Sequence, residues 1–260
     1  MTTWILPAAV AAVALLYASV GHAGATGYIA VMGLLGLSPE VIRPTALVLN
    51  LVVAAIGTVQ FGRAGHFRRD LFLPLAAASV PAAAIGGSLA LPTTIFEGLL
   101  GLVLAFSAVR IIVELFPRSG ESAAVFRPMP GEGPATLRQL SRPTLAAIGA
   151  ALGLASGLTG VGGGVFLTPL LLTLGVATTR QVAAVSVVFI LVNSAAGLGG
   201  WLARGSSLTA IEPVVVAAAA AGGFIGSRLG AYYLPIRGLR LLMAVVLAVA
   251  SVKLLAASVS

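Results

Sequence analysis

Long apolar runs, broken only by short polar or glycine-rich stretches, make up most of the chain. An α-helix needs about 20 apolar residues to cross the ~30 Å hydrocarbon core of a bilayer, and several runs reach that length. The pattern therefore predicts an all-α, polytopic membrane protein. The ten runs cover residues 4–20, 26–37, 45–61, 71–90, 95–116, 143–157, 164–176, 182–202, 208–230 and 238–257.

One polar segment, rich in proline and glycine, interrupts the series between Phe116 and Pro143. This composition is typical of a connecting loop. Because five runs precede the segment and five follow it, we predict two membrane repeats. The predicted boundaries are 1–116 for the first repeat, 117–142 for the linker and 143–260 for the second repeat, and the repeats together form one integrated transmembrane domain.

The two halves share three features in the same order, which indicates an internal duplication. The first feature is a set of glycines at three-residue spacing, and the second is an arginine soon after a helix-start signal. The third is the match of AIGGSLALP at 84–92 with FIGSRLGAYYLP at 224–235. The glycines are Gly21, Gly24 and Gly27 in GHAGATG and Gly157, Gly160 and Gly163 in GLTGVGG, and the arginines are Arg43 in SPEVIRP and Arg180 in ATTRQV.

The first two runs of each half are predicted to form a helical hairpin bent at the glycines. Together they are too long for one crossing, and the second run is too short to cross alone. Glycine permits the bend and lets neighbouring backbone approach closely. A hairpin, re-entrant or made of short spans, and three further spans move the chain an odd number of crossings per half. The two repeats are therefore predicted to be inverted.

The distribution of charge agrees with inverted repeats. In that arrangement one side of the membrane receives most basic residues, and the other side receives only Arg43, Arg204 and Lys253. Because basic loops favour the cytoplasm, the linker is predicted to be cytoplasmic and both termini to lie outside. The basic side holds Arg63, Arg68, Arg69, Arg118, Arg127, Arg138, Arg142, Arg180, Arg237 and Arg240, with Arg110 and Arg228 close to the same face.

Composition narrows the class of protein further. Hydrophobic residues make up 59% of the 260 residues and charged residues 8%, with a mean hydropathy of +1.09, which excludes a soluble globular domain. The net charge of +8 is scattered between apolar runs and forms no basic arm, so no nucleic-acid partner is expected. With no cysteine and two histidines, we expect no disulfide, no metal site and no cofactor.

The acidic residues argue against several kinds of chemistry. All seven lie in loops, at the ends of runs or within pairing distance of an arginine, and none lies in mid-membrane. This disfavours a cation substrate and carboxylate-coupled proton exchange. HExxH, a paired mid-membrane aspartate and a Cys or Ser–His arrangement are also missing from the sequence. We therefore predict that the protein is not an enzyme.

The glycine-rich bends are the first candidates for a substrate site. When a helix is broken inside the membrane, its first N–H groups lack partners and carry a partial positive charge, so they can bind an anion without a buried cation. Inverted-repeat transporters often use such broken helices near the midplane. The alternative is that the glycines only permit close helix packing, and we weigh the two equally. The predicted substrate-binding residues are Gly24, Thr26, Gly27, Thr159, Gly160, Gly162, Gly163 and Gly164, with Thr168 as a secondary candidate.

Two arginines follow the bends at matching places. Arg43 and Arg180 lie early in a predicted helix, where the dipole disfavours a cation, so binding of a substrate anion is one reason to retain them. The alternatives are contact with lipid phosphate or water and, for Arg43, an i, i+3 pair with Glu40. Ser186, about one turn beyond Arg180, is a further candidate for substrate binding.

Three other polar residues are secondary candidates. His22, in the first bend, is either a proton-sensitive ligand or a hydrogen-bonded interfacial residue. Asn50 and Asn193 lie within long apolar runs, where an unpaired amide is costly, so they bind either neighbouring helices or substrate. Bonding between helices is the favoured interpretation for both asparagines.

The segment GLTGVGGGVFLTPLLLTLGV resembles the signature GxGGGxxxxPxLxxxG of the sulfite exporter TauE/SafE family, also called the toluene sulfonate uptake permeases. The first bend departs from it, with alanine and threonine in GHAGATG where family members often repeat the glycine cluster. The resemblance implies a bacterial inner-membrane transporter of sulfite, sulfonates or related sulfur-containing anions. The matching residues are Gly160, Gly162, Gly163, Gly164, Pro169, Leu171 and Gly175.

The combined hypothesis is an inverted-repeat secondary transporter that binds its anion between the two glycine bends and rocks one repeat against the other. The alternatives are an anion channel, a transporter of a non-sulfur anion, a membrane-embedded enzyme and a purely structural subunit. The expected partners are a small sulfur-containing anion and the lipid bilayer. Glycine-lined surfaces at 86–87 and 222–226 also suggest a homodimer.

Overall fold

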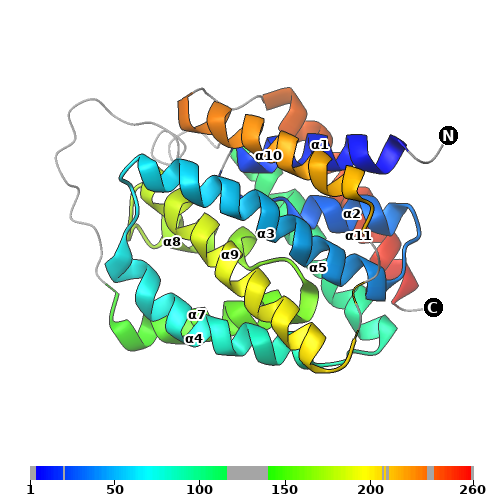
Figure 1. Ribbon diagram of the computed structural model, residues 1–260, viewed down its shortest axis with the longest axis horizontal. Helices are drawn as coiled ribbons and strands as arrows, with labels where there is room; N and C mark the ends of the chain where they lie inside the picture. The colour runs from blue at the N-terminus through cyan, green and yellow to red at the C-terminus, as the bar shows by residue number, and fades with distance from the viewer. Residues whose placement is uncertain are drawn as a thin grey trace.

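The computed structural model describes residues 4–19, 21–115, 140–206, 208, 211–232 and 237–258, and its regular structure there is entirely helical (Figure 1). This confirms the predicted all-α class. The helices of the first half are α1 (Ile5–Ala18), α2 (Ala25–Leu34), α3 (Pro39–Arg63), α4 (Arg69–Ser88) and α5 (Thr93–Leu115). Those of the second half are α7 (Arg142–Thr159), α8 (Gly164–Thr173), α9 (Thr179–Ala203), α10 (Pro213–Tyr232) and α11 (Arg237–Ala257).

Local sequence signals explain where the longer helices begin and end. The side chain of Thr178 accepts a hydrogen bond from the Gln181 N–H, and the Gln181 side chain accepts one from the Thr178 N–H, which together form a capping box before α9. At the other end of α9, the chain turns away through Gly205 with φ +83°. Gly65 plays the same part after α3, with φ +73°, because glycine adopts this left-handed conformation at little cost.

Several helices have the length and composition of membrane spans. Within the described residues, four segments are long and apolar enough to cross a bilayer: Pro39–Arg63, Arg69–Ser88, Thr93–Val113 and Arg180–Ala203. Shorter apolar helices accompany them, including the 14 residues of α1 and the ten residues of α2. At ~1.5 Å per residue, neither α1 nor α2 covers a ~30 Å hydrocarbon core.

Two helical hairpins run into the molecule from opposite ends (Figure 1). We call the end where α3 stops and α4, α7 and α9 start the linker end, and the end where α1 starts and α11 stops the terminal end. The α1–α2 hairpin runs inward from the terminal end and back, and the α7–α8 hairpin does the same from the linker end. The bent hairpins that the sequence predicts are therefore present in both halves.

Each half completes its packing with helices of the other half. Helix α4 packs along α7, and α1 packs along α10. The central helices α3 and α9 lie against each other, as do α5 and α11. Except for α8, which packs mainly on α9 of its own half, each helix has its main partner in the other half, so the two sets of five helices interlock instead of forming two separate bundles.

Glycine allows the α4–α7 pair to approach backbone to backbone. On α7, Gly149 and Gly153 face the carbonyl oxygens of Leu75 and Ser79, and a methyl group at either glycine would overlap that oxygen. The next glycine in the series, Gly157, faces the carbonyl of Ala83 in the same way. Small residues at four-residue spacing are a common means of close helix packing in membranes.

The glycine-lined surfaces that suggested a dimer pack against other helices of the same chain. Gly86 and Gly87 of α4 face the backbone of α7 and α9, at Leu154 and Gly197. Gly222 of α10 faces the carbonyl of Ala11 in α1. The intramolecular contacts at these three glycines explain why they are small, and so they give no support to a homodimer.

Candidate functional site

The second bend links α7 to α8 through a glycine-rich turn. Gly160, Gly162 and Gly163 have φ values of +78°, +79° and +77°. Other residues adopt this left-handed region only at a cost, because their Cβ crowds the backbone. Space is restricted as well, since a Cβ on Gly162 would lie 2.7 Å from the Asn50 amide nitrogen and 2.9 Å from Ile190. The backbone at this bend therefore requires its glycines.

The start of α8 carries hydrogen-bond donors that the protein does not use. The first hydrogen bonds of the helix run from Phe166 and Leu167 to the Gly163 carbonyl. Within the described part of the chain, no hydrogen bond is made by the N–H groups of residues 162–165. These N–H groups carry the partial positive charge of a helix N-terminus. Residues 162–164 are buried and Val165 is partly buried.

Buried polar side chains lie near this helix start: Asn50, Ser156 and Ser194 adjoin Gly162 or Gly163, and Asn193 directly precedes Ser194 on α9. Asn50, Ser156, Asn193 and Ser194 are each fully buried, and they come from α3, α7 and α9. The Asn50 Nδ2 donates to Ser194 Oγ over 3.3 Å, and the Asn193 Nδ2 donates to the Phe189 carbonyl over 2.8 Å. A Cβ on Gly162 would lie 3.1 Å from Ser194 Oγ, and one on Gly163 would lie 3.5 Å from Ser156 Cβ.

Three of the polar atoms in this cluster lack a protein partner. They are Asn50 Oδ1, Asn193 Oδ1 and Ser156 Oγ. Leaving a buried polar atom without a hydrogen bond costs about 1–3 kcal/mol, so these three atoms call for a partner that the protein itself does not supply. We refer to Asn50, Ser156, Asn193, Ser194 and the N–H groups of 162–165 as the second-bend cluster.

The side-chain hydroxyls of the first bend are hydrogen-bonded within the protein. Gly24 precedes α2 with φ +102°, and a Cβ there would meet the ring of Tyr28. The Tyr17 and Thr26 hydroxyls are hydrogen-bonded to each other over 2.7 Å, and the Tyr28 hydroxyl donates to the Ala23 carbonyl. Gly27 packs against Val13 and Tyr17 of α1. The side chains at this bend therefore use their hydroxyls within the protein.

The two bends lie next to each other. A Cβ on Gly164, the first residue of α8, would lie 3.8 Å from the His22 ring in the first bend. The His22 ring also stands edge-on to Tyr17, with the ring centroids 6.4 Å apart. The N–H groups of residues 24–27 at the start of α2 also make no hydrogen bond within the described residues, so the two bends differ in their side chains: only the second has buried side-chain polar atoms without a partner.

Arg43 is buried among backbone carbonyls. Its Nε donates to Gly157 O over 3.0 Å, its Nη1 to Leu89 O over 3.1 Å, and its Nη2 to Gly87 O over 3.0 Å and Gly157 O over 2.6 Å. A further bond from Nη2 reaches Gly86 O. The guanidinium carbon also lies 5.2 Å from the centre of the Trp201 ring. Arg43 thus caps the C-terminal carbonyls of α4 and α7, and among the described residues it forms no ion pair with Glu40.

Arg180 occupies a different environment from Arg43. It is exposed at the start of α9, whereas Arg43 is 2% exposed. Counted from the helix starts, Arg43 is the fifth residue of α3 and Arg180 is the second residue of α9, so the residue of α9 that corresponds to Arg43 is Ala183. The equivalence of the two arginines in the sequence comparison is therefore corrected by the structure.

The same correction applies to the glycines. The residues that precede the short helices as N-caps are Gly24 for α2 and Gly163 for α8, whereas the sequence comparison aligns Gly24 with Gly160. Contacts support the structural alignment, since Gly160 lies against Arg43 and Gly21 lies against Ala183. Because the glycines of both halves are spaced by three residues, the sequence comparison paired each glycine of the first half with the wrong glycine of the second, one position too early in the series.

The remaining candidate hydroxyls form hydrogen bonds within the protein. Thr168 of α8 donates to Ser186 Oγ of α9 over 2.8 Å, which ties the short helix to the long one. Thr159 donates to the Ala155 carbonyl over 2.7 Å. Two members of the second-bend cluster, Ser156 and Ser194, are absent from the candidates that the sequence suggests. Ser156 lies one turn before Gly160 and Ser194 follows Asn193, so proximity in sequence was the available signal.

The family model described as "Sulfite exporter TauE/SafE" matches residues 6–254 of the chain. The chain is also similar to the probable membrane transporter protein y4hK of Sinorhizobium fredii. The two are 42% identical over 243 residues, which cover 94% of this chain and 94% of that protein. No solved structure matches the chain.

Proposed function

The chain belongs to the sulfite exporter TauE/SafE family of membrane transporters, and on this premise we propose that it carries sulfite or a related small sulfur-containing oxyanion across the bacterial inner membrane. The observation that supports this substrate class most directly is the second-bend cluster. Its unbonded N–H groups lie beside a buried Ser156 hydroxyl that also has no partner. Together they match the oxygen atoms of a small anion.

The proposed binding mode uses dipoles and no buried cation. The Arg43 guanidinium binds four carbonyl oxygens, which leaves the N–H groups of residues 162–165 as the main positive charge at the bend. Hydrogen bonds to a charged group contribute about 1.5–3 kcal/mol each. Rotation of the Asn50 amide about its last bond would exchange its oxygen and nitrogen and add a further donor.

The hairpins that enter from opposite ends support the proposal of transport by alternating access. In this proposal the linker end is cytoplasmic and the terminal end is outside, as the excess of arginines near the linker indicates. The two repeats are inverted, and the α7–α8 hairpin moves relative to α3 and α9 to expose the second-bend cluster to one side at a time. An open anion pore is the second candidate, because the same helix start would also line a channel.

Sulfite binding to the purified protein tests the proposal. Isothermal titration calorimetry is expected to give one saturable site, with competition by ethanesulfonate and thiosulfate. The Ser156→Ala variant is expected to bind sulfite about tenfold more weakly or worse, since one hydrogen bond to the anion is lost.

Ser227→Ala is the matched control, because Ser227 is equally buried but donates to the Gly223 carbonyl of its own helix. Equal weakening by both serine variants would mean that the second-bend cluster is not the site. Binding of none of the sulfur-containing anions by the folded wild-type protein would remove the substrate class.

A further inference from the structure

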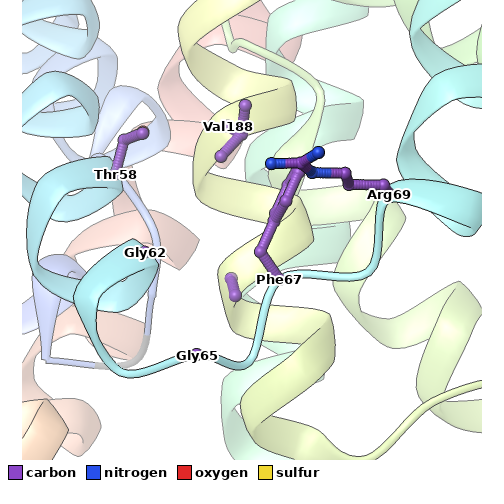
Figure 2. Close-up of a pocket in the computed structure, with 7 residues that line it drawn as sticks. Thr58, Gly62, Gly65, Phe67, Arg69 and Val188 are labelled. Carbon is purple, nitrogen blue, oxygen red and sulfur yellow. The ribbon is translucent and has the colours of Figure 1, made fainter.

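A cavity opens at the linker end of the molecule, apart from the second-bend cluster (Figure 2). It has a volume of about 400 Å³ and lies between the end of α3, the start of α4 and the first half of α9. We call it the linker-end cavity. Its lining residues are Thr58, Gly62, Gly65, Phe67, Arg69, Ala184 and Val188.

Arg69 gives the linker-end cavity a positive charge. Figure 2 shows its side chain reaching from the start of α4 over Phe67 towards Val188 on α9. The neighbouring acid, Asp70, is bound by both the Nε and the Nη2 of Arg68, at 2.8 and 2.5 Å. No ion pair to Arg69 is found in the part of the chain that the structure covers, and no acid lines the cavity.

Helix α9 connects the linker-end cavity with both bends. Ala184 lines the cavity, and its neighbour Ala183 touches Gly21 of the first bend. Val188 also lines the cavity, and the next residue, Phe189, touches Gly163 of the second bend. On α9, each residue that lines the cavity is therefore the direct neighbour of a residue that contacts a bend.

Side chains pack tightly around Arg43 at the terminal end of the molecule. Where α9 has the small Ala183, α3 has Arg43, whose side chain binds the C-terminal carbonyls of α4 and α7. Trp201 lies against the Arg43 guanidinium, and the Arg204 guanidinium lies 3.8 Å from the centre of the same ring. Arg43 and Arg204 also share the Leu89 carbonyl as a hydrogen-bond acceptor.

We propose that the linker-end cavity is the mouth through which a small oxyanion reaches the second-bend cluster, and that Arg69 draws the anion into it. The proposal rests on the proposed function. A cationic group in a recessed mouth raises the local concentration of anions and the rate at which they bind. Arg69 acts on the anion before it reaches the bend, so it governs the rate of access and leaves the affinity of the second-bend cluster unchanged.

Cysteine labelling tests this proposal directly, because the protein contains no cysteine of its own. Val188→Cys introduces one thiol into the cavity wall. Two methanethiosulfonate reagents of similar size are compared, one bearing a sulfonate and the other a trimethylammonium group. The anionic reagent is expected to react about tenfold faster than the cationic one. Ethanesulfonate, which does not react with thiols, is expected to slow labelling.

Three charge variants identify the residue responsible. Arg69→Gln is expected to bring the ratio of the two labelling rates close to one, whereas Arg69→Lys retains the preference for the anion. Arg63→Gln is the matched control, because Arg63 is an exposed arginine at the end of α3 that does not line the cavity. An equal loss of preference in Arg63→Gln would overturn the role of Arg69.

The labelling result is separable from the proposed function. If the thiol is unreactive in the folded protein, or reacts equally fast with both reagents, the cavity is not an anion mouth, even where sulfite still binds. Slowing of the reaction by anionic lipid but not by ethanesulfonate would assign the cavity to lipid headgroups and overturn the proposal. If the labelling pattern holds while no anion binds at the bend, the proposed function fails and the anion-attracting cavity remains.

Discussion

Gly162 illustrates how a single position can depend on two independent constraints. Its φ of +79° disfavours any side chain, and the space that a side chain would need is occupied by Asn50, Ile190 and Ser194. The glycine brings the backbone N–H groups within reach of the buried polar side chains. The conformation of one residue therefore determines the geometry of the proposed binding site.

Gly162→Ala is expected to destabilise the protein and to abolish anion binding. Strain in the left-handed region costs about 1–3 kcal/mol, and the displacement of Asn50 adds to this cost. Thermal unfolding in detergent and sulfite titration measure the two effects. Gly205→Ala is the control, because Gly205 also has a positive φ, +83°, but an added methyl group meets nothing within 4 Å. Equal destabilisation by both variants would contradict the crowding at Gly162.

The Arg43 side chain is expected to stabilise the folded protein. Arg43→Ala leaves the carbonyls of Gly86, Gly157 and Leu89 without this donor, and the expected loss is about 3 kcal/mol or more in the free energy of unfolding. Arg43→Lys restores only part of it, since an ammonium has fewer donors and no planar fork. The exposed Arg180→Ala is expected to change stability by less than about 0.5 kcal/mol. Denaturation of the three variants in one detergent makes the comparison.

The individual glycines were predictable, but the partners of Arg43 were not. Repeated glycines in an apolar chain mark a break that only glycine permits, so Gly160, Gly162 and Gly163 were identified from sequence. The carbonyls that bind Arg43 lie 43 to 114 residues away along the chain. The sequence around Arg43 does not indicate these contacts, because they form only when α4 and α7 pack together.

At the scale of helices, the basic residues of the terminal end share one role. Lys253 donates to the carbonyls of Gly33 and Leu34 at the end of α2, and Arg204 donates to Leu89 beyond α4. Arg43 caps α4 and α7. A cation is stabilised at a helix C-terminus by the partial negative charge there. These three residues lie on the side that has few basic residues, and the positive charge of each is stabilised by the carbonyl groups at a helix end.

Because α7 contacts α4 through its glycines, we expect α7 to tolerate no larger side chain at these positions. Gly153→Leu would separate α7 from the Ser79 backbone of α4 and is expected to lower stability by several kcal/mol, beyond the ~1–3 kcal/mol of ordinary overpacking. Gly199→Leu on α9 is the matched control, since Gly199 is exposed and has open space around it. Similar unfolding temperatures for the two variants would contradict the backbone contact between α4 and α7.

The helices themselves were largely predictable from apolar runs, whereas their correspondence between halves was not. The run 45–61 lies inside α3 and the run 182–202 inside α9, because a membrane helix must be apolar over most of its length. The alignment of Gly24 with Gly160 was wrong, since glycines spaced by three residues match in more than one register. The helix starts after Gly24 and Gly163 are needed to choose between registers.

At the scale of the molecule, the interlocked halves and the opposed hairpins fit a transporter with two alternating faces. In the proposed transport cycle, the linker-end cavity and the side-chain contacts of Arg43 at the terminal end would correspond to a state open at the linker end. The sequence also predicts that the linker end faces the cytoplasm and that the terminal end faces the outside.

Single cysteines at turns are expected to report this orientation in intact membranes. Gly65→Cys and Ser141→Cys, at the linker end, are expected to react with an impermeant thiol reagent only from the cytoplasmic side. Gly36→Cys and Gly205→Cys, in turns at the terminal end, are expected to react only from outside. Reaction of all four positions from one side would contradict the proposed crossing pattern, and reversed sides would invert the orientation.

Counterflow of labelled sulfite in proteoliposomes tests the central claim most directly. The account predicts saturable uptake that is accelerated by unlabelled sulfite inside the vesicles, competed by ethanesulfonate and abolished in Gly162→Ala but retained in Gly205→Ala. Uptake that rises linearly with sulfite concentration and gains nothing from internal sulfite would contradict alternating access and indicate a channel.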